Sequence, residues 1–370
     1  MDLDFAARRV REGLVDLLVP DIERRPGPGT RSALPFYNPG MTAARDLSVL
    51  LAGRLVPRGG RVLDGLAATG ALGIRIAAES GAAPHVVLND KNPRAVALIR
   101  ANLEGNRIEG AEVLHSDLNA HLADDSPYEL VEIDPFGSPV PFLDAALRSG
   151  RRDSVLGVAA TDTAVLCGAK PEAARRRYLV DVRHTDAHAE VATRVLLGYL
   201  ARAAARFDRA VEPILAYAAE HFVHVHVRIS EGAARADRAL ANLGFIRFNP
   251  ATGAHDPLPG ALPVGTIGPL WLGPLADRAA LDSLRPAPAT GFAASRILDR
   301  MREEVALPPF FFENNETARR AGVDPPPLSA VLDGLRARGH RAAPTLFREN
   351  SFKTDAPASE LLTMYREVRS

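Results

Sequence analysis

The sequence has little cysteine and no long apolar run. Only Cys167 is a cysteine, so neither an intramolecular disulfide nor a zinc site with two cysteine ligands can form. We therefore expect a protein of a reducing compartment without a bound metal. No apolar stretch approaches the roughly 20 residues that span a bilayer, and the N-terminus carries acid where a signal peptide carries base. These features predict a cytoplasmic protein with no membrane segment.

The sequence also lacks a net charge, because 45 Lys+Arg face 45 Asp+Glu. Nucleic-acid-binding proteins usually carry a basic surface, so the overall balance gives no sign of such a partner. Lysine is nearly absent, and almost every cation is an arginine. Arginine suits phosphate binding and base stacking, but a GC-rich genome gives the same bias, and we favour this second explanation.

Length and composition indicate two domains. A single hydrophobic core stops growing at roughly 250 to 300 residues, and this chain has 370 residues, of which 46% are hydrophobic. Proline and glycine cluster in residues 249–274 and again in 308–327, after a region of regular alternation. We therefore predict one domain over residues 1–230 and a smaller α+β domain over residues 231–370.

The first domain shows the pattern of an α/β fold. Short apolar runs alternate with helix-like stretches, which is typical of a parallel sheet covered by helices. Helices are predicted over 93–102 and 186–207, and alternation in 211–217 and 221–229 predicts an antiparallel hairpin that closes the sheet. The predicted parallel strands are residues 61–64, 85–90, 112–117, 129–134 and 155–162.

Each of these five runs ends in an aspartate. In an open α/β sheet the carboxyl ends of the strands form the ligand crevice, so the five acids would face one site. A single aspartate after a strand is usually a helix N-cap, which is the alternative for any one of them. The five residues are Asp64, Asp90, Asp117, Asp134 and Asp162.

A loop of small residues follows the first run and opens a helix near Ile74. Glycine lets the backbone approach a ligand closely, and the helix N-terminus adds hydrogen-bond donors. The spacing of Gly65, Gly70 and Gly73 differs from the G-x-G-x-x-G of dinucleotide-binding enzymes. This difference disfavours a nicotinamide oxidoreductase.

Two further acids suggest a nucleoside site beside this loop. Asp90 ends the next run, where a carboxylate can bind two ribose hydroxyls. Asp117 and Leu118 follow the third run, at the expected place of an adenine. Ribose and adenine contacts without a phosphate-binding motif favour S-adenosylmethionine (SAM), whose cationic sulfonium suits an acidic site.

The fourth run ends in Asp134, Pro135 and Phe136, an order typical of amino-group methyltransferases. An exocyclic amine on a nucleobase is a poor nucleophile, because its lone pair is delocalised into the ring. Hydrogen bonds to a carboxylate and to a backbone carbonyl can turn that lone pair toward a methyl donor. The proline fixes the backbone, and the aromatic ring stacks on the base. A buried proline turn with Phe136 in the core is the alternative.

With these motifs the chain resembles the tRNA (guanine26-N2)-dimethyltransferase family along nearly its whole length. The matching segments are residues 36–46, 63–70, 134–144, 160–169, 268–275 and 352–356. The resemblance implies a Rossmann-like methyltransferase domain that uses SAM to methylate the exocyclic N2 amine of guanine 26 in tRNA to dimethylguanosine. It also implies that the C-terminal domain binds tRNA. Members often carry paired cysteines before residue 268, and this chain has none there, so again no metal is expected.

The resemblance also implies site residues. Asp134 would hold the guanine amine, with Pro135 beside it, and Phe36 and Phe136 would clamp an extruded base. The residues expected to bind SAM are Arg45, Asp64, Arg75, Asp90, Asp117 and Leu118. We expect a monomer.

Alternatives remain open at this stage. The chain could methylate another nucleic acid or a protein, or be a nonenzymatic tRNA-binding protein with a decayed SAM fold; intact Asp90 and Asp134 disfavour the latter. His224 and His226 fall on one face of a predicted strand with a spacing that a metal could use. Because no third ligand has a defined position in the sequence, we favour hydrogen-bonded strand histidines.

Overall fold

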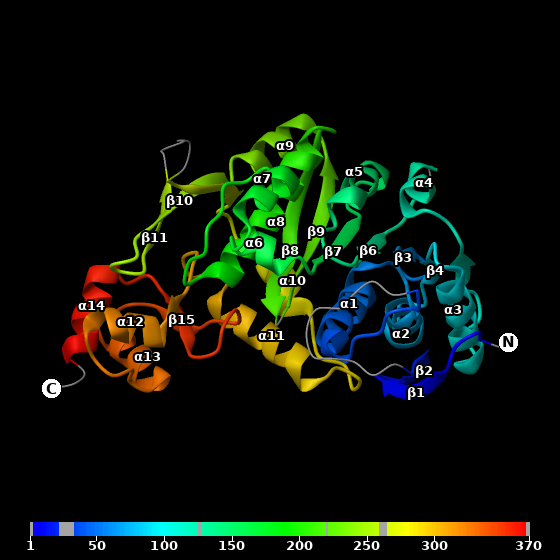
Figure 1. The fold of residues 1–370 in the computed structure, drawn as a ribbon, viewed down its shortest axis with the longest axis horizontal. Coiled ribbons are helices and arrows are strands. Elements are labelled where there is room, and N and C mark those ends of the chain that lie inside the picture. Colours follow the sequence, from blue (N-terminus) through cyan, green and yellow to red (C-terminus); the bar gives the residue numbers. More distant parts are fainter. Residues whose placement is uncertain (1–2, 22–32, 125–126, 220, 259–264, 368–370) are drawn as a thin grey trace.

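A seven-stranded sheet dominates the computed structural model, which describes residues 3–21, 33–124, 127–219, 221–258 and 265–367 (Figure 1). The strand order is β5-β4-β3-β6-β7-β9-β8. Five strands are parallel: β3 (Arg61–Asp64), β4 (His85–Asn89), β5 (Glu112–Leu114), β6 (Leu130–Ile133) and β7 (Val155–Ala160). The hairpin of β8 (Arg209–Ala219) and β9 (Phe222–Glu231) completes the sheet antiparallel to β7. The predicted α/β fold is confirmed.

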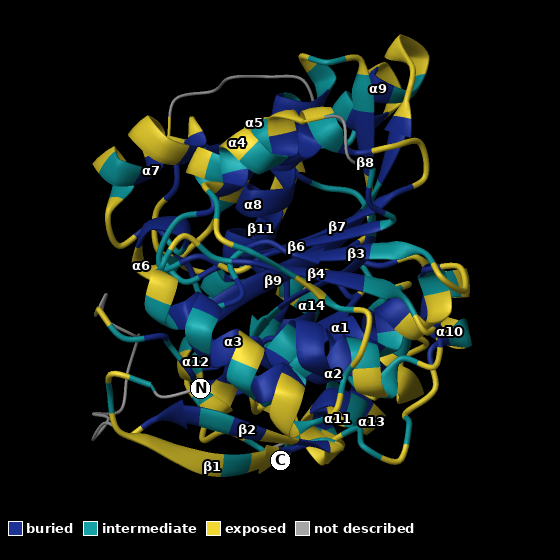
Figure 2. Cartoon of the chain, turned by 90° about the vertical axis from the view of Figure 1, so that its right-hand side faces the viewer, coloured by how far each residue is buried: buried dark blue, intermediate teal, exposed yellow. Residues whose placement is uncertain are grey.

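Helices cover both faces of this sheet, as Figure 2 shows. One face carries α1 (Thr42–Leu55), α2 (Ala71–Glu79) and α3 (Pro93–Gly105). The other carries α4 (Leu118–Ala123), α5 (Val140–Ser149), α6 (Thr163–Leu166), α7 (Pro171–Tyr178) and α8 (His188–Ala205). The helices predicted over 93–102 and 186–207 correspond to α3 and α8. Covering both faces buries the apolar strands and leaves the strand ends available for a site.

An N-terminal hairpin, β1 (Ala7–Glu12) and β2 (Val15–Pro20), lies against α2 and α3 and was not predicted. Its inward side chains Val15, Leu17 and Val19 are at most 1% exposed and join the core beneath α1 and α2. Gly13 stands in the two-residue turn with φ of +56°, a conformation that favours glycine. The signal in the sequence was weak, because Val15, Leu17 and Val19 alternate after Gly13 whereas the strand before it has only Ala7 and Val10 as apolar residues.

The chain after β9 adds two smaller sheets. The first joins β10 (Leu243–Phe248), β11 (His255–Leu258) and β12 (Ile267–Trp271), and the second joins β13 (Phe312–Glu313), β14 (Ala342–Pro344) and β15 (Ser351–Thr354). A third apolar cluster lies among α12 (Asn314–Ala321), α13 (Leu328–Ala337) and α14 (Ala358–Glu367). Helix α9 (Ala233–Leu240) packs on β8 and α8. The C-terminal part of the chain therefore has its own sheets and core.

Two C-terminal helices nevertheless pack with the N-terminal part. Helices α10 (Arg278–Ser283) and α11 (Phe292–Glu304) place Leu281, Leu298 and Met301 in the apolar cluster that contains α1 and α2. The two parts of the chain thus share buried surface. In the described part of the chain, no helix combines the length and the apolar character that crossing a bilayer requires.

Candidate active site

Three of the five aspartates meet at the carboxyl ends of adjacent strands. Asp64 ends β3, Asp90 follows β4 and Asp134 follows β6, and β3 lies between the other two strands. Asp64 is 5% exposed, and burial is the first reason that its pKa rises to about 7, with the charges of Glu132, Asp134 and Asp90 adding to the rise. A site of this kind attracts a cation, because a nearby positive charge would favour the ionised carboxylates.

The loop after β3 is held by carboxylates. The Gly73 N–H donates to Asp64 Oδ2 at 2.9 Å, and the Ala68 N–H donates to Asp90 Oδ2 at 2.9 Å. A side chain at Gly73 would meet the Leu88 side chain at 2.7 Å, so a glycine is required where α2 crosses β4. The small residues of this loop therefore serve close packing as well as access to the strand ends.

Asp117 and Leu118 lie at the start of α4. Asp117 Oδ1 accepts from the N–H groups of Asn119 and Ala120 at 3.0 and 3.3 Å, so this exposed aspartate is the helix N-cap. Leu118 is 1% exposed, and a Cβ added at Gly65 would meet its methyl groups at 3.0 Å. The structure thus brings Leu118 against the loop that follows β3.

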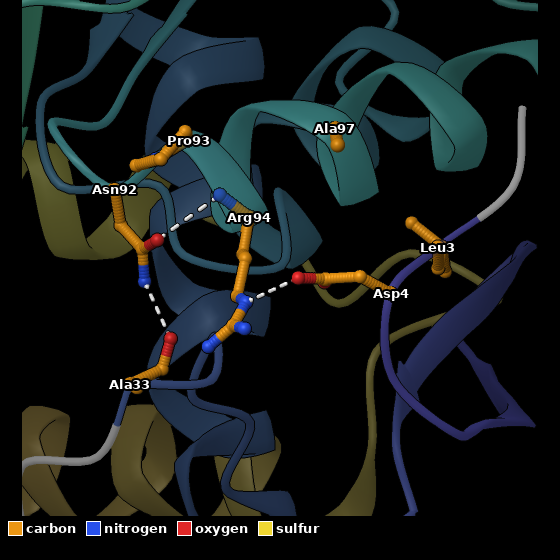
Figure 3. Close-up of a pocket in the computed structure, with 7 residues that line it drawn as sticks. All are labelled: Leu3, Asp4, Ala33, Asn92, Pro93, Arg94 and Ala97. Atoms are coloured by element: carbon orange, nitrogen blue, oxygen red, sulfur yellow. Dashed lines mark hydrogen bonds and ion pairs between the residues drawn. The ribbon is translucent and has the colours of Figure 1, made fainter.

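A hollow of about 640 Å³ lies between the N-terminal segment and the start of α3, and its lining residues are Leu3, Asp4, Ala33, Asn92, Pro93, Arg94 and Ala97 (Figure 3). The Asn92 side chain caps α3 by accepting from the Arg94 N–H at 3.0 Å, and it donates to the Ala33 carbonyl at 3.2 Å. Arg94 Nε also contacts Asp4 Oδ2 at 2.8 Å. Segments from the N-terminus and from the start of α3 therefore meet at the turn that follows Asp90.

Asp134 differs from the other four strand-end aspartates, because it has no hydrogen-bond or ion-pair partner among the described residues. Asp162, for comparison, accepts from the Tyr178 hydroxyl at 2.7 Å and from Arg177 at 3.1 Å. The Asp134 side chain is solvent-accessible, yet the surrounding protein raises its pKa by desolvation, while His224 and Arg45 oppose that rise. An unpartnered carboxylate at this position is free to accept hydrogen bonds from a substrate.

The backbone after Asp134 is held in one shape. Pro135 is buried, and Gly137 takes a φ of +83°, which a side chain would strain. The Gly137 N–H donates to Thr161 Oγ1 at 2.7 Å, and the Thr161 N–H donates to the Gly137 carbonyl at 3.0 Å. These two bonds tie the loop to the end of β7 and fix where Asp134 and Phe136 stand.

Phe36 and Phe136 come from distant parts of the chain and touch. Their ring centroids lie 4.6 Å apart with an interplanar angle of 74°, an edge-to-face contact. A flat base held between two rings needs roughly 7 Å between them, since each carbon contact takes about 3.5 Å. The two rings therefore fill the space between them, and one of them must move before a base can enter.

Arg45 and Arg75 share a carboxylate that the sequence analysis missed. Glu12, at the end of β1, receives Arg45 Nε at 2.6 Å, Arg45 Nη2 at 2.7 Å and Arg75 Nη1 at 3.0 Å. Arg75 is 1% exposed, and its guanidinium also contacts Asp46 at 2.6 Å and Glu79 at 2.9 Å. Arg75 thus lies behind Glu12, while Arg45, on α1, is the more accessible of the two.

The Glu12 carboxylate is strongly held in its ionised form. Burial alone would raise its pKa, but hydrogen bonds and charge from Arg45, a hydrogen bond from the Tyr37 hydroxyl at 2.7 Å and the charge of Arg75 together lower its pKa to about 2. The same contact raises the pKa of Tyr37 to about 12, after burial as the larger cause. Glu12, Tyr37 and the two arginines form one connected ionic cluster.

Comparison with known proteins shows a close likeness over nearly the whole chain. A profile of the N2,N2-dimethylguanosine tRNA methyltransferases matches residues 19–366. The tRNA (guanine(26)-N(2))-dimethyltransferase of Thermococcus kodakarensis is 39% identical, covering 97% of this chain and 99% of its own; that of Methanosphaerula palustris is also 39% identical, over 94% and 96%. Trm1 from Pyrococcus horikoshii, solved in complex with S-adenosyl-L-methionine, superposes with a TM-score of 0.85 at 34% identity over 96% of this chain and 99% of its own.

Proposed function

Since the chain belongs to the family of N2,N2-dimethylguanosine tRNA methyltransferases, we propose that it methylates the exocyclic N2 amine of guanine 26 in tRNA to dimethylguanosine, with SAM as methyl donor. The observation that carries the proposal at the level of the site is Asp134. It is a carboxylate at the end of β6 without a hydrogen-bond or ion-pair partner among the described residues, next to two aspartates that hold the loop after β3.

The cofactor would lie across the ends of β3 and β4. Asp90 would bind the ribose hydroxyls, and Asp117 and Leu118 would border the adenine. Asp64, beneath the loop, adds negative charge that favours a sulfonium, and SAM supplies a methyl group carried on that sulfonium. We assign Arg45 to the carboxylate of the methionine part, because its side chain is 11% exposed and that of Arg75 is 1% exposed.

Arg75 would support SAM binding through Glu12. Its guanidinium already contacts Glu12, Asp46 and Glu79, and its side chain is 1% exposed. It therefore fixes the carboxylate that in turn orients Arg45. In this arrangement Arg75 is a positioning residue for the cofactor site.

Asp134 would act on the guanine amine. Its carboxylate accepts a hydrogen bond from the N2–H and so turns the amine lone pair toward the methyl group, while the Pro135 carbonyl is the second acceptor. The same carboxylate takes up or relays the proton that leaves the amine. For the second methylation the monomethylated amine must turn, because its remaining hydrogen has to reach the same acceptor.

The base would be flipped out of the tRNA helix and held by aromatic rings. Phe36 and Phe136 now contact each other edge to face, so the incoming guanine replaces their contact by stacking on them. Stacking offsets the lost ring contact. This motion admits a flat base beside the Asp134 carboxylate.

The finer organisation is also proposed. We assign SAM binding and catalysis to residues 1–230 and tRNA binding to residues 231–370, where two sheets and a separate apolar cluster provide a second body of structure. We also propose that the chain works as a monomer in the cytoplasm. Size-exclusion chromatography with light scattering tests the monomer, and a shift to twice the chain mass would contradict it.

A methylation assay tests the function itself. Labelled SAM is incubated with the chain and two tRNA transcripts that differ only in carrying guanine or adenine at position 26. We expect label only in the guanine transcript, and N2-methyl- and N2,N2-dimethylguanosine in its nuclease digest by mass spectrometry. Label in DNA or protein instead would support another amino-methyltransferase, and tRNA binding without SAM binding would support a nonenzymatic protein.

A further inference from the structure

A buried cluster of two imidazoles and one carboxylate lies in the sheet below the candidate active site. Glu132 is on β6, two residues before Asp134, and His224 and His226 are on β9. His226 Nε2 lies 3.0 Å from Glu132 Oε1, and His224 Nε2 lies 3.6 Å from Glu132 Oε2. One ligand atom from each of the three residues lies within 4.8 Å of the others. All three side chains are 0 to 6% exposed.

The sheet is built to bring these groups together. Strand β7 separates β6 from β9 (Figure 1), and its Gly157 pairs with Glu132 on one side and with His226 on the other. A Cβ on Gly157 would meet Glu132 Oε2 at 2.1 Å, so only a glycine leaves room for the carboxylate to cross the strand. Because Gly157 has no side chain, the Glu132 carboxylate can extend across β7 and reach the two histidines.

The residues around the two histidines resemble those that usually surround metal-binding histidines. The Tyr217 hydroxyl lies 3.3 Å from His224 Nδ1, so it can fix the tautomer that leaves Nε2 facing Glu132. Ser48 Oγ, from α1, lies 3.1 Å from His226 Nε2 and offers a fourth ligand atom near the cluster. His226 Nδ1 is buried without a hydrogen-bond partner among the described residues.

A cation near Glu132 would stabilise its buried negative charge. No lysine or arginine of the described chain forms an ion pair with this carboxylate, although it is 2% exposed and close to Asp64 and Asp134. Buried carboxylates are normally paired with a cation or bound to a metal, because an isolated buried charge is strongly unfavourable. Burial raises the pKa of Glu132, whereas the charge and hydrogen bonds of His226 and His224 lower it overall, and a divalent cation between the three groups would take over that role.

We propose that Glu132, His224 and His226 bind one divalent transition metal of the zinc type, enclosed in the sheet below Asp134. Two imidazole nitrogens and a carboxylate oxygen suit zinc and its neighbours, whereas magnesium and calcium prefer oxygen ligands alone. The metal braces β6 against β9 across Gly157 and so steadies the strand that carries Asp134. This site departs from our expectation of no metal, which rested on the cysteine count and on the lack of a third ligand in the sequence.

Metal content and metal-dependent stability test this site, and neither needs methyltransferase activity. Because the cluster is enclosed, the metal is expected to enter during folding and to resist chelators in the native state. The full chain is purified, its metals are measured by mass spectrometry, and it is then unfolded in guanidinium with a chelator and refolded with or without zinc. We expect about one zinc per chain as purified, and a melting temperature several degrees higher after refolding with zinc.

Variants of the three residues, together with cobalt as a spectroscopic probe, test whether the metal binds at this cluster. Cobalt added during refolding should give the visible absorption of a nitrogen- and oxygen-bound ion in the wild type and in the control His221→Gln, whose histidine is exposed. Glu132→Gln and His226→Gln should lose both the absorption and the zinc response of the melting temperature. Equal metal binding by wild type and His226→Gln overturns the proposal. So does a wild type that contains no stoichiometric transition metal and refolds to the same melting temperature with and without zinc, a result that needs no variant to fold.

Discussion

Glu12 and Arg45 form a two-point ion pair that joins the N-terminal hairpin to α1. Arg45 Nε and Nη2 lie 2.6 and 2.7 Å from the two carboxylate oxygens, and the Arg45 side chain is 11% exposed. Bidentate pairs of this kind fix the plane and direction of a guanidinium. Arg45 is therefore held in place by a hairpin that lies far from it in the sequence.

The first prediction concerns Glu12→Gln. The variant keeps the shape of the side chain but removes its charge, so Arg45 loses its fixed position and SAM binding should weaken about tenfold, which corresponds to about 1.4 kcal/mol. Isothermal titration calorimetry with SAM measures the change. Glu112→Gln, which removes a half-exposed acid at the edge of the sheet, is the control and should bind SAM as the wild type does. Unchanged affinity in Glu12→Gln would show that the hairpin does not orient Arg45 for the cofactor.

The second prediction concerns acid stability. The pKa of Glu12 is about 2 in the folded chain and 4.5 when unperturbed, so its contribution to the free energy of unfolding is fully present above pH 4.5 and is lost as the pH falls toward 2. The shift corresponds to roughly 3 kcal/mol. Chemical denaturation at pH 7 and at pH 3 measures this contribution of Glu12 to the free energy of unfolding.

The comparison between variant and wild type isolates Glu12 from other acids. We expect Glu12→Gln to be less stable than the wild type at pH 7 and the difference to shrink at pH 3, because Glu12 of the unfolded wild type takes up a proton below pH 4.5 while the folded chain, with a pKa of about 2, stays ionised. A stability difference that stays constant over this range would mean that the loss comes from packing and not from the ion pair.

The third prediction concerns the aromatic pair. Phe36→Ala and Phe136→Ala should each raise the KM for tRNA or lower kcat by 10-fold or more, since stacking on one base contributes about 1 to 3 kcal/mol. Neither variant should change SAM affinity. Phe136→Tyr keeps the ring and serves as the control. If the alanine variants methylate tRNA as the wild type does, the guanine is not held between these rings.

The regular part of the fold followed from the sequence, because parallel strands buried on both faces are near-continuous apolar runs separated by helical periodicity. The hairpin of β1 and β2 was missed, because the apolar residues alternate only after Gly13 and not before it. The ionic cluster of Glu12 could not be foreseen, since nothing in a sequence shows that a carboxylate at residue 12 meets guanidinium groups at residues 45 and 75.

The sequence predicted which residues form the candidate site but not the contacts between them. The aspartates at the strand ends were visible as a pattern, yet only the structure separates Asp117, which caps a helix, from Asp134, which has no partner in the described chain. Glu132 and His226 are 94 positions apart and meet across a strand between them, so their contact depends on strand order and register. Such contacts arise from tertiary structure and leave no local signal.

The most direct test of the account is methyl transfer by Asp134→Asn, measured together with SAM affinity. The asparagine keeps the size of the side chain but offers no charge to take up a proton, so the rate of methylation at guanine 26 should fall by about 10² to 10⁴. SAM should bind within about twofold of the wild type by calorimetry, because the Asp64, Asp90 and Arg45 contacts remain. A variant that binds SAM normally and still methylates guanine 26 at near the wild-type rate would contradict the role of Asp134.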